Sequence, residues 1–311
     1  MPLNPQVEGL LKQMADAGGK GFAEMSVPEC RATFKGLLGM LPPSAAQLAN
    51  VEDRNIPGPG GDLKVRIYTP KGSGPFPALV YIHGGGWVIG DIDTHDSVCR
   101  ELSEGAGCVV AAVDYRLSPE AKFPSATDDC LTATQWVADN AASLNVDASK
   151  IAVGGDSAGG NLSTVTAIRC RDENGPKLAA QLLIYPVARV DGVETESMKR
   201  NASGYLLEKR DMEWFLSHYL ASDTDGVNVH ASPLLSKDLS GLPPALVITA
   251  EYDPLCDEGE DYADALQKAG VPTSKSRYDG AIHGFYNFYP VLDQGRDAIN
   301  ESCQWLKGQF A

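Results

Sequence analysis

The 311-residue sequence has no excess of basic residues and no long hydrophobic run. Its 26 Lys and Arg residues are outnumbered by 41 Asp and Glu residues, which gives a formal charge of −15 at pH 7. Because a duplex-binding protein neutralises phosphates with a basic face, this balance argues against a nucleic-acid partner, and it equally disfavours an anionic membrane. No apolar segment reaches the ~18–20 residues of a transmembrane helix.

Clustered cysteines and internal repeats are also lacking. The seven cysteines are widely spaced and form no C-x-x-C pair, which is typical of free thiols in a reducing compartment. No Cys/His cluster has the spacing of a zinc site. Residues 1–21 carry Glu8 and Asp16 and lack the basic start and apolar core of a signal peptide. We therefore expect a cytoplasmic protein without a metal site.

What the chain does contain is an alternation of short apolar runs and helical stretches. The first two of eight expected strands are polar and alternating, as in antiparallel edge strands, whereas the middle ones are nearly continuous apolar runs typical of a buried parallel sheet. The alternation predicts an α/β fold with a mostly parallel, eight-stranded sheet flanked by helices. The expected strands are Val51–Ile56, Lys64–Thr69, Ala78–His83, Val109–Tyr115, Ile151–Gly155, Gln181–Pro186, Ala245–Ala250 and Ser274–Asp279. Helices are expected over residues 128–142, 159–171, 208–220 and 259–269.

Two segments interrupt this alternation. Residues 1–48 are amphipathic and helical in pattern, with Pro42 and Pro43 as a break, and residues 187–235 form a long insertion between two strands. An insertion of that size is too long for a plain connection. We expect both segments to form a cap over the carboxyl edge of the sheet, which leaves residues 49–186 and 236–311 for the α/β domain.

The sharpest local motif is Gly155-Asp156-Ser157-Ala158-Gly159, which follows an apolar strand and opens a helix. This is the context of a nucleophile elbow, in which a tight turn exposes the serine hydroxyl. Side chains at the two flanking glycines would collide with the neighbouring strand or helix. The helix N-terminus adds N–H donors near a developing anion. The alternative is a plain strand-to-helix turn.

A second motif, His83-Gly84-Gly85-Gly86-Trp87, directly follows the third expected strand. Successive glycines let backbone N–H groups face a cavity, which suits the developing oxyanion of an acyl-transfer intermediate. The N–H of Ala158 is the expected partner donor. A flexible loop or phosphate cradle is the alternative, but the Lys-Ser/Thr and G-x-G-x-x-G patterns of phosphate sites are missing. For His83 we expect an orienting, hydrogen-bonding role, and Asp156 is a further supporting candidate.

The remaining members of a Ser–acid–His set follow by elimination. Three of the five histidines follow the serine, and two of these fall in the expected cap helix or the linker that returns to the sheet. His283 instead follows the last strand, at the edge where ligands bind in open α/β sheets. Asp253 follows the preceding strand, with Glu251 as second choice. In these roles Ser157 attacks a carbonyl, His283 transfers the proton, and Asp253 orients the imidazole.

Together these motifs resemble the hormone-sensitive-lipase-like esterases, also called bacterial family IV. The set includes Asp253-Pro254-Leu255, Asp257-Glu258-Gly259 and His283-Gly284-Phe285, and Tyr115–Glu120 is similar to the family's Y-R-L-A-P-E with Ser118 in place of Ala. The resemblance spans residue 64 to the C-terminus; the N-terminal segment fits the family's cap by length alone, and Cys256 stands where relatives often carry Arg.

The resemblance implies an α/β-hydrolase fold with a helical cap and a cofactor-free carboxylesterase for short acyl esters. It implies the triad Ser157, Asp253 and His283, and oxyanion donors from Ala158 and two of Gly84, Gly85 and Gly86, with Gly85 preferred. It also leaves open a homodimer formed through the edge strand near the C-terminus.

Other activities compatible with the same triad are an amidase or peptidase and a long-chain lipase. A non-catalytic binding protein is a further alternative, since the plant gibberellin receptors resemble this family but lack the histidine that is present here. The acidic charge favours small uncharged esters over carboxylate-bearing ones as substrates.

Overall fold

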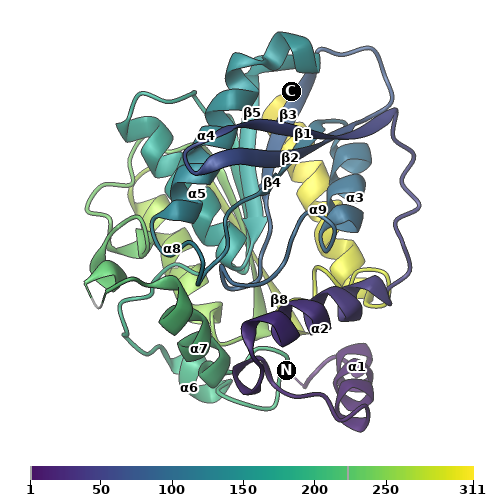
Figure 1. Ribbon diagram of the computed structural model, residues 1–311, viewed down its shortest axis with the longest axis vertical. Coiled ribbons are helices and arrows are strands. Elements are labelled where there is room, and N and C mark those ends of the chain that lie inside the picture. Colours follow the sequence, from purple (N-terminus) through teal and green to yellow (C-terminus); the bar gives the residue numbers. More distant parts are fainter. Residues whose placement is uncertain (1, 223) are drawn as a thin grey trace.

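The computed structural model describes residues 2–222 and 224–311, and its centre is one eight-stranded sheet (Figure 1). The strand order is β1-β2-β4-β3-β5-β6-β7-β8. β1 pairs antiparallel with β2 and β2 antiparallel with β4, and every later pairing is parallel. The predicted eight-stranded, mostly parallel sheet is therefore confirmed. The strands are β1 (Asn50–Gly58), β2 (Gly61–Thr69), β3 (Phe76–Ile82), β4 (Val109–Asp114), β5 (Val146–Asp156), β6 (Ala180–Ile184), β7 (Ala245–Tyr252) and β8 (Thr273–Ile282).

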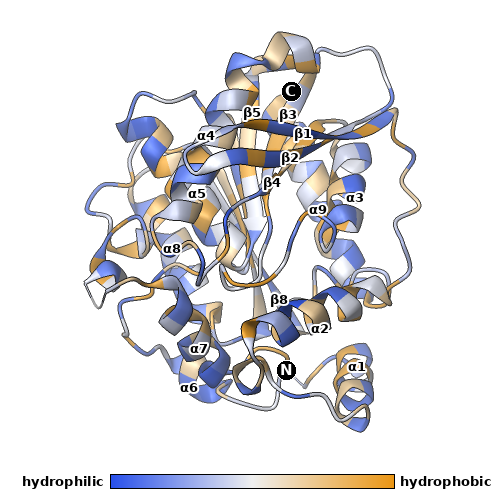
Figure 2. Cartoon of the chain, in the orientation of Figure 1, coloured by the Kyte–Doolittle hydropathy of each residue, from blue (hydrophilic) through white to orange (hydrophobic). Residues whose placement is uncertain are grey.

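One detail of the strand prediction is wrong. β2 is not an edge strand, because it lies between β1 and β4, so the polar alternation marks a strand near the edge and not only the edge itself. Figure 2 shows hydrophilic residues along much of β1 and β2, in contrast to the sheet's centre. An antiparallel strand can keep one solvated face, whereas the parallel strands are covered on both faces.

Helices cover the two faces of the sheet in separate groups (Figure 1). In β3, Ala78, Val80 and Ile82 pack on one face, while Leu79 and Tyr81 pack on the other, which explains the uninterrupted apolar run. The first face carries α4 (Ser125–Asp139), α5 (Ala158–Asp172) and α8 (Cys256–Lys268), and the second carries α3 (Asp96–Ala106) and α9 (Asp293–Phe310). A short 3₁₀ helix, η2 (Ala141–Leu144), follows α4.

The two segments predicted as a cap lie together at the end of the molecule where the parallel strands finish (Figure 1). The N-terminal segment holds α1 (Pro5–Asp16), η1 (Phe22–Glu24) and α2 (Val27–Gly39); the insertion holds α6 (Glu196–Arg200), α7 (Lys209–Tyr219), η3 (Asp225–Val227) and η4 (Pro233–Leu235). They contact each other directly, because the N–H of Ala23 donates to Asp211 at 2.9 Å and the rings of Phe22 and Phe215 lie 5.7 Å apart. Within the described residues, no helix has the length and apolar character needed to cross a membrane.

Candidate active site

Ser157 sits on the sharp turn between β5 and α5. Its backbone has φ 57° and ψ −120°, a conformation that L-residues rarely adopt. A Cβ at Gly155 would lie 2.1 Å from the carbonyl oxygen of Ile82, and one at Gly159 only 1.9 Å from the same oxygen. The motif therefore needs both glycines for steric reasons, as the sequence predicts.

His283 and Asp253 follow β8 and β7, whose carboxyl ends are neighbours in the sheet. The Nδ1 atom of His283 lies 2.7 Å from Oδ2 of Asp253, and its Nε2 atom lies 3.0 Å from Oγ of Ser157. The Asp253 side chain is fully buried, and its Oδ1 accepts the N–H of Leu255 at 2.8 Å. The structure thus brings the three predicted residues into one chain of hydrogen bonds. Glu251, the second choice for the acid, accepts the N–H of Gly280 instead.

The glycine motif forms the turn after β3, and we call residues 83–89 the oxyanion loop. The carbonyl of Gly85 accepts the N–H groups of Val88 and Ile89 at 3.0 and 2.9 Å, which closes the turn. Gly85 and Gly86 have φ of 119° and 57°, and a Cβ at Gly85 would lie 2.1 Å from the Ile89 carbonyl oxygen. The N–H of Gly84 is already engaged, because it donates to Asp156 at 3.1 Å.

Asp156 is buried beneath this loop and accepts hydrogen bonds from several directions. In addition to Gly84, Tyr81 donates at 2.8 Å and Asn287 at 3.0 Å, and Nε2 of His95 lies 3.3 Å away. Burial by itself raises the pKa of Asp156, but the attraction of His95 and these hydrogen bonds outweigh burial, so the pKa falls below its ordinary value. Asp156 is therefore an ionised anchor for the oxyanion loop.

His83 lies next to this anchor. Its Nδ1 atom is 2.8 Å from the carbonyl oxygen of Gly84, which can only accept, so Nδ1 carries the proton. The ring stacks on Tyr115 with centroids 4.2 Å apart. Burial, followed by the nearby His95, lowers the pKa of His83 to about 4, so the imidazole is neutral near pH 7.

A narrow apolar pocket of about 60 Å³ opens at Ser157. Its walls come from both segments predicted to form a cap and from the residues around the sheet, so the pocket exists only where these parts meet. Among the lining residues are Phe22, Phe34, Leu38, Gly85, Gly86, Ile89, Tyr185, Val187, Leu206, Leu207, Met212, Phe215, His283, Asn287 and Phe288. In the described part of the chain, no group of three or more His, Cys, Asp or Glu side chains is arranged to hold a metal ion. All seven cysteines have free thiols, which confirms that prediction.

Sequence reasoning missed two polar residues that support the site. His95 stands 61 positions before Asp156 and outside any motif, so only the fold reveals the contact. Glu258 belongs to a quoted motif, yet its buried position was not predicted. Its Oε1 accepts the N–H groups of Ala188 and Arg189 at 2.8 and 3.3 Å, which ties α8 to the start of the insertion. Burial raises the pKa of Glu258 to about 8.

Comparison with known proteins agrees with this geometry. A model of a family described as having the α/β-hydrolase fold matches residues 79–287. The chain is 40% identical to the carboxylic ester hydrolase LipN of Mycobacterium tuberculosis, across 99% of this chain and 84% of that protein. It is 36% identical to an ethyl acetate hydrolase of Pseudomonas putida, across 96% of both.

Solved structures are equally similar. A hyperthermophilic esterase from the archaeon Pyrobaculum calidifontis superimposes with a TM-score of 0.95 at 45% identity, and the match covers 99% of each chain. The family match extends over more than half of the chain, and these relatives match it almost from end to end. The chain therefore belongs to the α/β-hydrolase fold family, as the resemblance to hormone-sensitive-lipase-like esterases implied.

Proposed function

We infer that the protein is a serine carboxylesterase that hydrolyses short-to-medium acyl esters through an acyl-enzyme. The observation that carries this inference is the hydrogen-bonded chain from Ser157 through His283 to Asp253 at the mouth of an apolar pocket. The curated relatives named as ester hydrolases support the same activity. The reaction needs no redox partner and no group beyond the ester and water.

In the first half of the reaction, the Ser157 hydroxyl attacks the ester carbonyl while Nε2 of His283 takes its proton. Asp253 accepts a hydrogen bond from the Nδ1–H group of His283 and stabilises the imidazolium, while the proton stays on the ring. When the tetrahedral intermediate collapses, the carbon–oxygen bond to the alcohol breaks and His283 gives its proton to the leaving oxygen. Water then enters and attacks the acyl carbon while His283 removes its proton. The bond from that carbon to Oγ of Ser157 breaks, His283 returns the proton to Oγ, and the acid leaves.

The oxyanion donors are the N–H groups of Gly85, Gly86 and Ala158. Gly84 is left out because its N–H donates to Asp156. Its part is structural, since that hydrogen bond anchors the first residue of the glycine run. Removal of one oxyanion donor typically lowers kcat by about 10²–10³-fold.

The pocket dimensions support a short acyl chain. The free volume at Ser157 is about 60 Å³, and aromatic and aliphatic side chains enclose it. Residues 1–48 and 187–235 form the cap that limits this volume, and positions 1 and 223 of those ranges lie outside the described residues. We propose that the preferred substrates are small and uncharged and that the protein acts in the cytoplasm. The family resemblance adds the expectation that two copies pair through the edge strand β8.

Turnover of p-nitrophenyl butyrate by the wild type and by Ser157→Ala tests the activity. We expect the variant to lose about 10⁴-fold or more of kcat, while Ser149→Ala, an exposed serine at the start of β5, keeps full activity. A wild type no faster than Ser157→Ala would refute the inference. Across C2 to C16 esters, kcat/KM should fall steeply beyond about eight acyl carbons; a maximum at C12 or above would indicate a lipase, and faster anilide cleavage an amidase.

A further inference from the structure

We propose that Arg31, on the cap helix α2, is a positioning residue for the oxyanion loop. The N-terminal cap segment would then do more than cover the pocket, since it would also hold the N–H donors of the reaction in place. This inference rests on the proposed function, because those donors matter only if Ser157 attacks an ester.

The Arg31 guanidinium reaches the loop directly. Its Nε donates to the carbonyl oxygen of Val88 at 2.9 Å, and its Nη2 donates to the carbonyl oxygen of Ser118 at 3.0 Å. The same guanidinium holds both oxygens of Glu120, at 2.9 and 2.7 Å. The planar fork of arginine can serve all these acceptors at once, which the single ammonium of lysine cannot do.

Val88 is the point through which this contact reaches the donors. Its N–H donates to the Gly85 carbonyl at 3.0 Å, while its carbonyl accepts from Arg31. A shift of Val88 therefore moves Gly85. The preceding carbonyl, of Trp87, accepts the N–H of Ser118 at 2.9 Å, so Arg31 and residue 118 hold two successive carbonyls of the loop.

The loop needs such external contacts because its backbone is strained. Trp87 has φ of 60°, in the left-handed region that a bulky residue seldom occupies. Strained backbone of this kind persists only when its surroundings hold it. Here the Trp87 ring also stacks on Tyr219 of α7 at 4.1 Å, so both cap segments contact the strained turn.

One face of α2 connects the loop to the pocket. Arg31, Phe34, Lys35 and Leu38 are spaced i, i+3, i+4 and i+7, so they lie on the same side of the helix. Phe34 and Leu38 line the pocket, so the helix that forms part of the pocket wall also contacts the loop.

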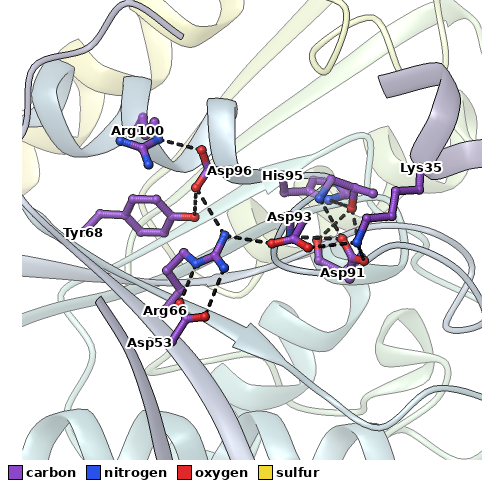
Figure 3. Close-up of polar contacts among 10 residues, drawn as sticks. Lys35, Asp53, Arg66, Tyr68, Asp91, Asp93, His95, Asp96 and Arg100 are labelled. Atoms are coloured by element: carbon purple, nitrogen blue, oxygen red, sulfur yellow. Dashed lines mark hydrogen bonds and ion pairs between the residues drawn. The ribbon is translucent and has the colours of Figure 1, made fainter. Parts of the chain in front are cut away.

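Lys35 makes a second connection farther along, shown in Figure 3, where its ammonium reaches Asp91 and Asp93 at 2.8 Å. Asp91 in turn binds the N–H of Thr94, next to His95. Because Lys35 is half exposed, its ion pairs are screened by water and contribute less than the contacts of Arg31.

The test compares Arg31→Met with Arg210→Gln. Arg210 is the control, because this cap arginine also bonds glutamate side chains, those of Glu24 and Glu208, but has no hydrogen bond to the oxyanion loop. The measurements are kcat and KM for p-nitrophenyl butyrate, and Ki for two ketones of equal length. The Ser157 oxygen adds to the carbonyl carbon of a trifluoromethyl ketone, and the ketone oxygen becomes an oxyanion. The methyl ketone binds without this addition, as a ground-state ligand.

A misplacement of about 1 Å can lower a rate by about 100-fold, so partial release of the loop predicts a fall in kcat of about tenfold or more for Arg31→Met. The trifluoromethyl ketone should bind about tenfold more weakly, while KM and the methyl-ketone Ki stay within twofold. Arg31→Lys should fall between wild type and Arg31→Met, and Glu120→Gln and Arg210→Gln should stay within twofold of the wild type.

Three outcomes would overturn the proposal. The first is a kcat for Arg31→Met within twofold of that for Arg210→Gln, and the second is an equal weakening of the binding of both ketones by Arg31→Met. The third applies if Arg31→Met does not fold, and is a folded Arg31→Lys with wild-type kcat. Equal weakening would show that Arg31 acts through the pocket alone. Failure of the proposed function is a separate result, because the wild type would then have no Ser157-dependent turnover against which to compare the variants.

Discussion

Phe215 forms the wall of the pocket that faces the oxyanion loop, and its truncation is expected to lengthen the acyl chain that the enzyme accepts. The side chain is only 3% exposed, and a Cβ placed on Gly86 would lie 2.3 Å from its ring. Phe215→Ala removes this wall from a pocket of about 60 Å³. Each additional buried methylene contributes about 0.8 kcal/mol, equivalent to about fourfold in kcat/KM. Entry of two or more methylenes therefore raises the ratio of kcat/KM for octanoate to that for butyrate at least about tenfold.

The assay is a series of p-nitrophenyl esters from C2 to C12, with thermal unfolding measured in parallel. Truncation of a buried phenylalanine typically lowers the free energy of unfolding by about 3–5 kcal/mol. Trp214→Ala is the control, because Trp214 is the neighbouring aromatic residue on α7, contacts Phe215 edge-on, and is absent from the pocket wall. An unchanged octanoate-to-butyrate ratio in Phe215→Ala, or an equal change in Trp214→Ala, would refute the reasoning.

Two further predictions concern buried groups. Burial raises the pKa of Glu258 from 4.5 to about 8, so between about pH 5 and 8 the Glu258 carboxyl is protonated in the folded chain but ionised in the unfolded chain. The contribution of Glu258 to the free energy of unfolding therefore falls as pH rises through that range. Glu258→Gln should reduce the fall in Tm over that range in differential scanning fluorimetry; a variant that tracks the wild type would contradict this. Gly159→Ala should abolish esterase activity and lower Tm, because its Cβ would lie 1.9 Å from the Ile82 carbonyl oxygen. A fully active Gly159→Ala would instead show that the turn can widen. Gly9→Ala is the control: Gly9 lies in a helix with nothing within 4 Å of an added Cβ, so this variant should raise the free energy of unfolding by about 0.5–1 kcal/mol.

The sheet could be predicted from the sequence because each central strand carries its own evidence. A strand buried on both faces must be apolar at nearly every position, and β3, β4, β6, most of β7 and the second half of β5 meet that condition. The helices α3 and α9 were not located, although both are amphipathic. α9 is rich in charged and polar residues, and only its packing beside α3 shows which face is buried.

The positions of Ser157, Asp253 and His283 follow from a rule of topology, since each stands just after a strand at the same edge of the sheet. Contacts among residues in different elements obey no such rule. Arg31 resembles any surface arginine of an amphipathic helix until the fold brings it to Val88, 57 positions later. The same holds for His95 beside Asp156. The sequence thus predicted the three residues that meet in one hydrogen-bonded chain, whereas the side chains that support them required the structure.

The wide separation of the site residues also has a consequence for protein synthesis. His283 follows Ser157 by 126 positions, and at about 5–20 residues per second a ribosome needs roughly 6–25 s to add them. During that time the nucleophile elbow has no general base, and for the earlier part of the interval Asp253 and the pocket wall around Phe215 are also missing. In the proposed mechanism, ester hydrolysis that depends on all three residues can therefore begin only when the last strand of the sheet is in place.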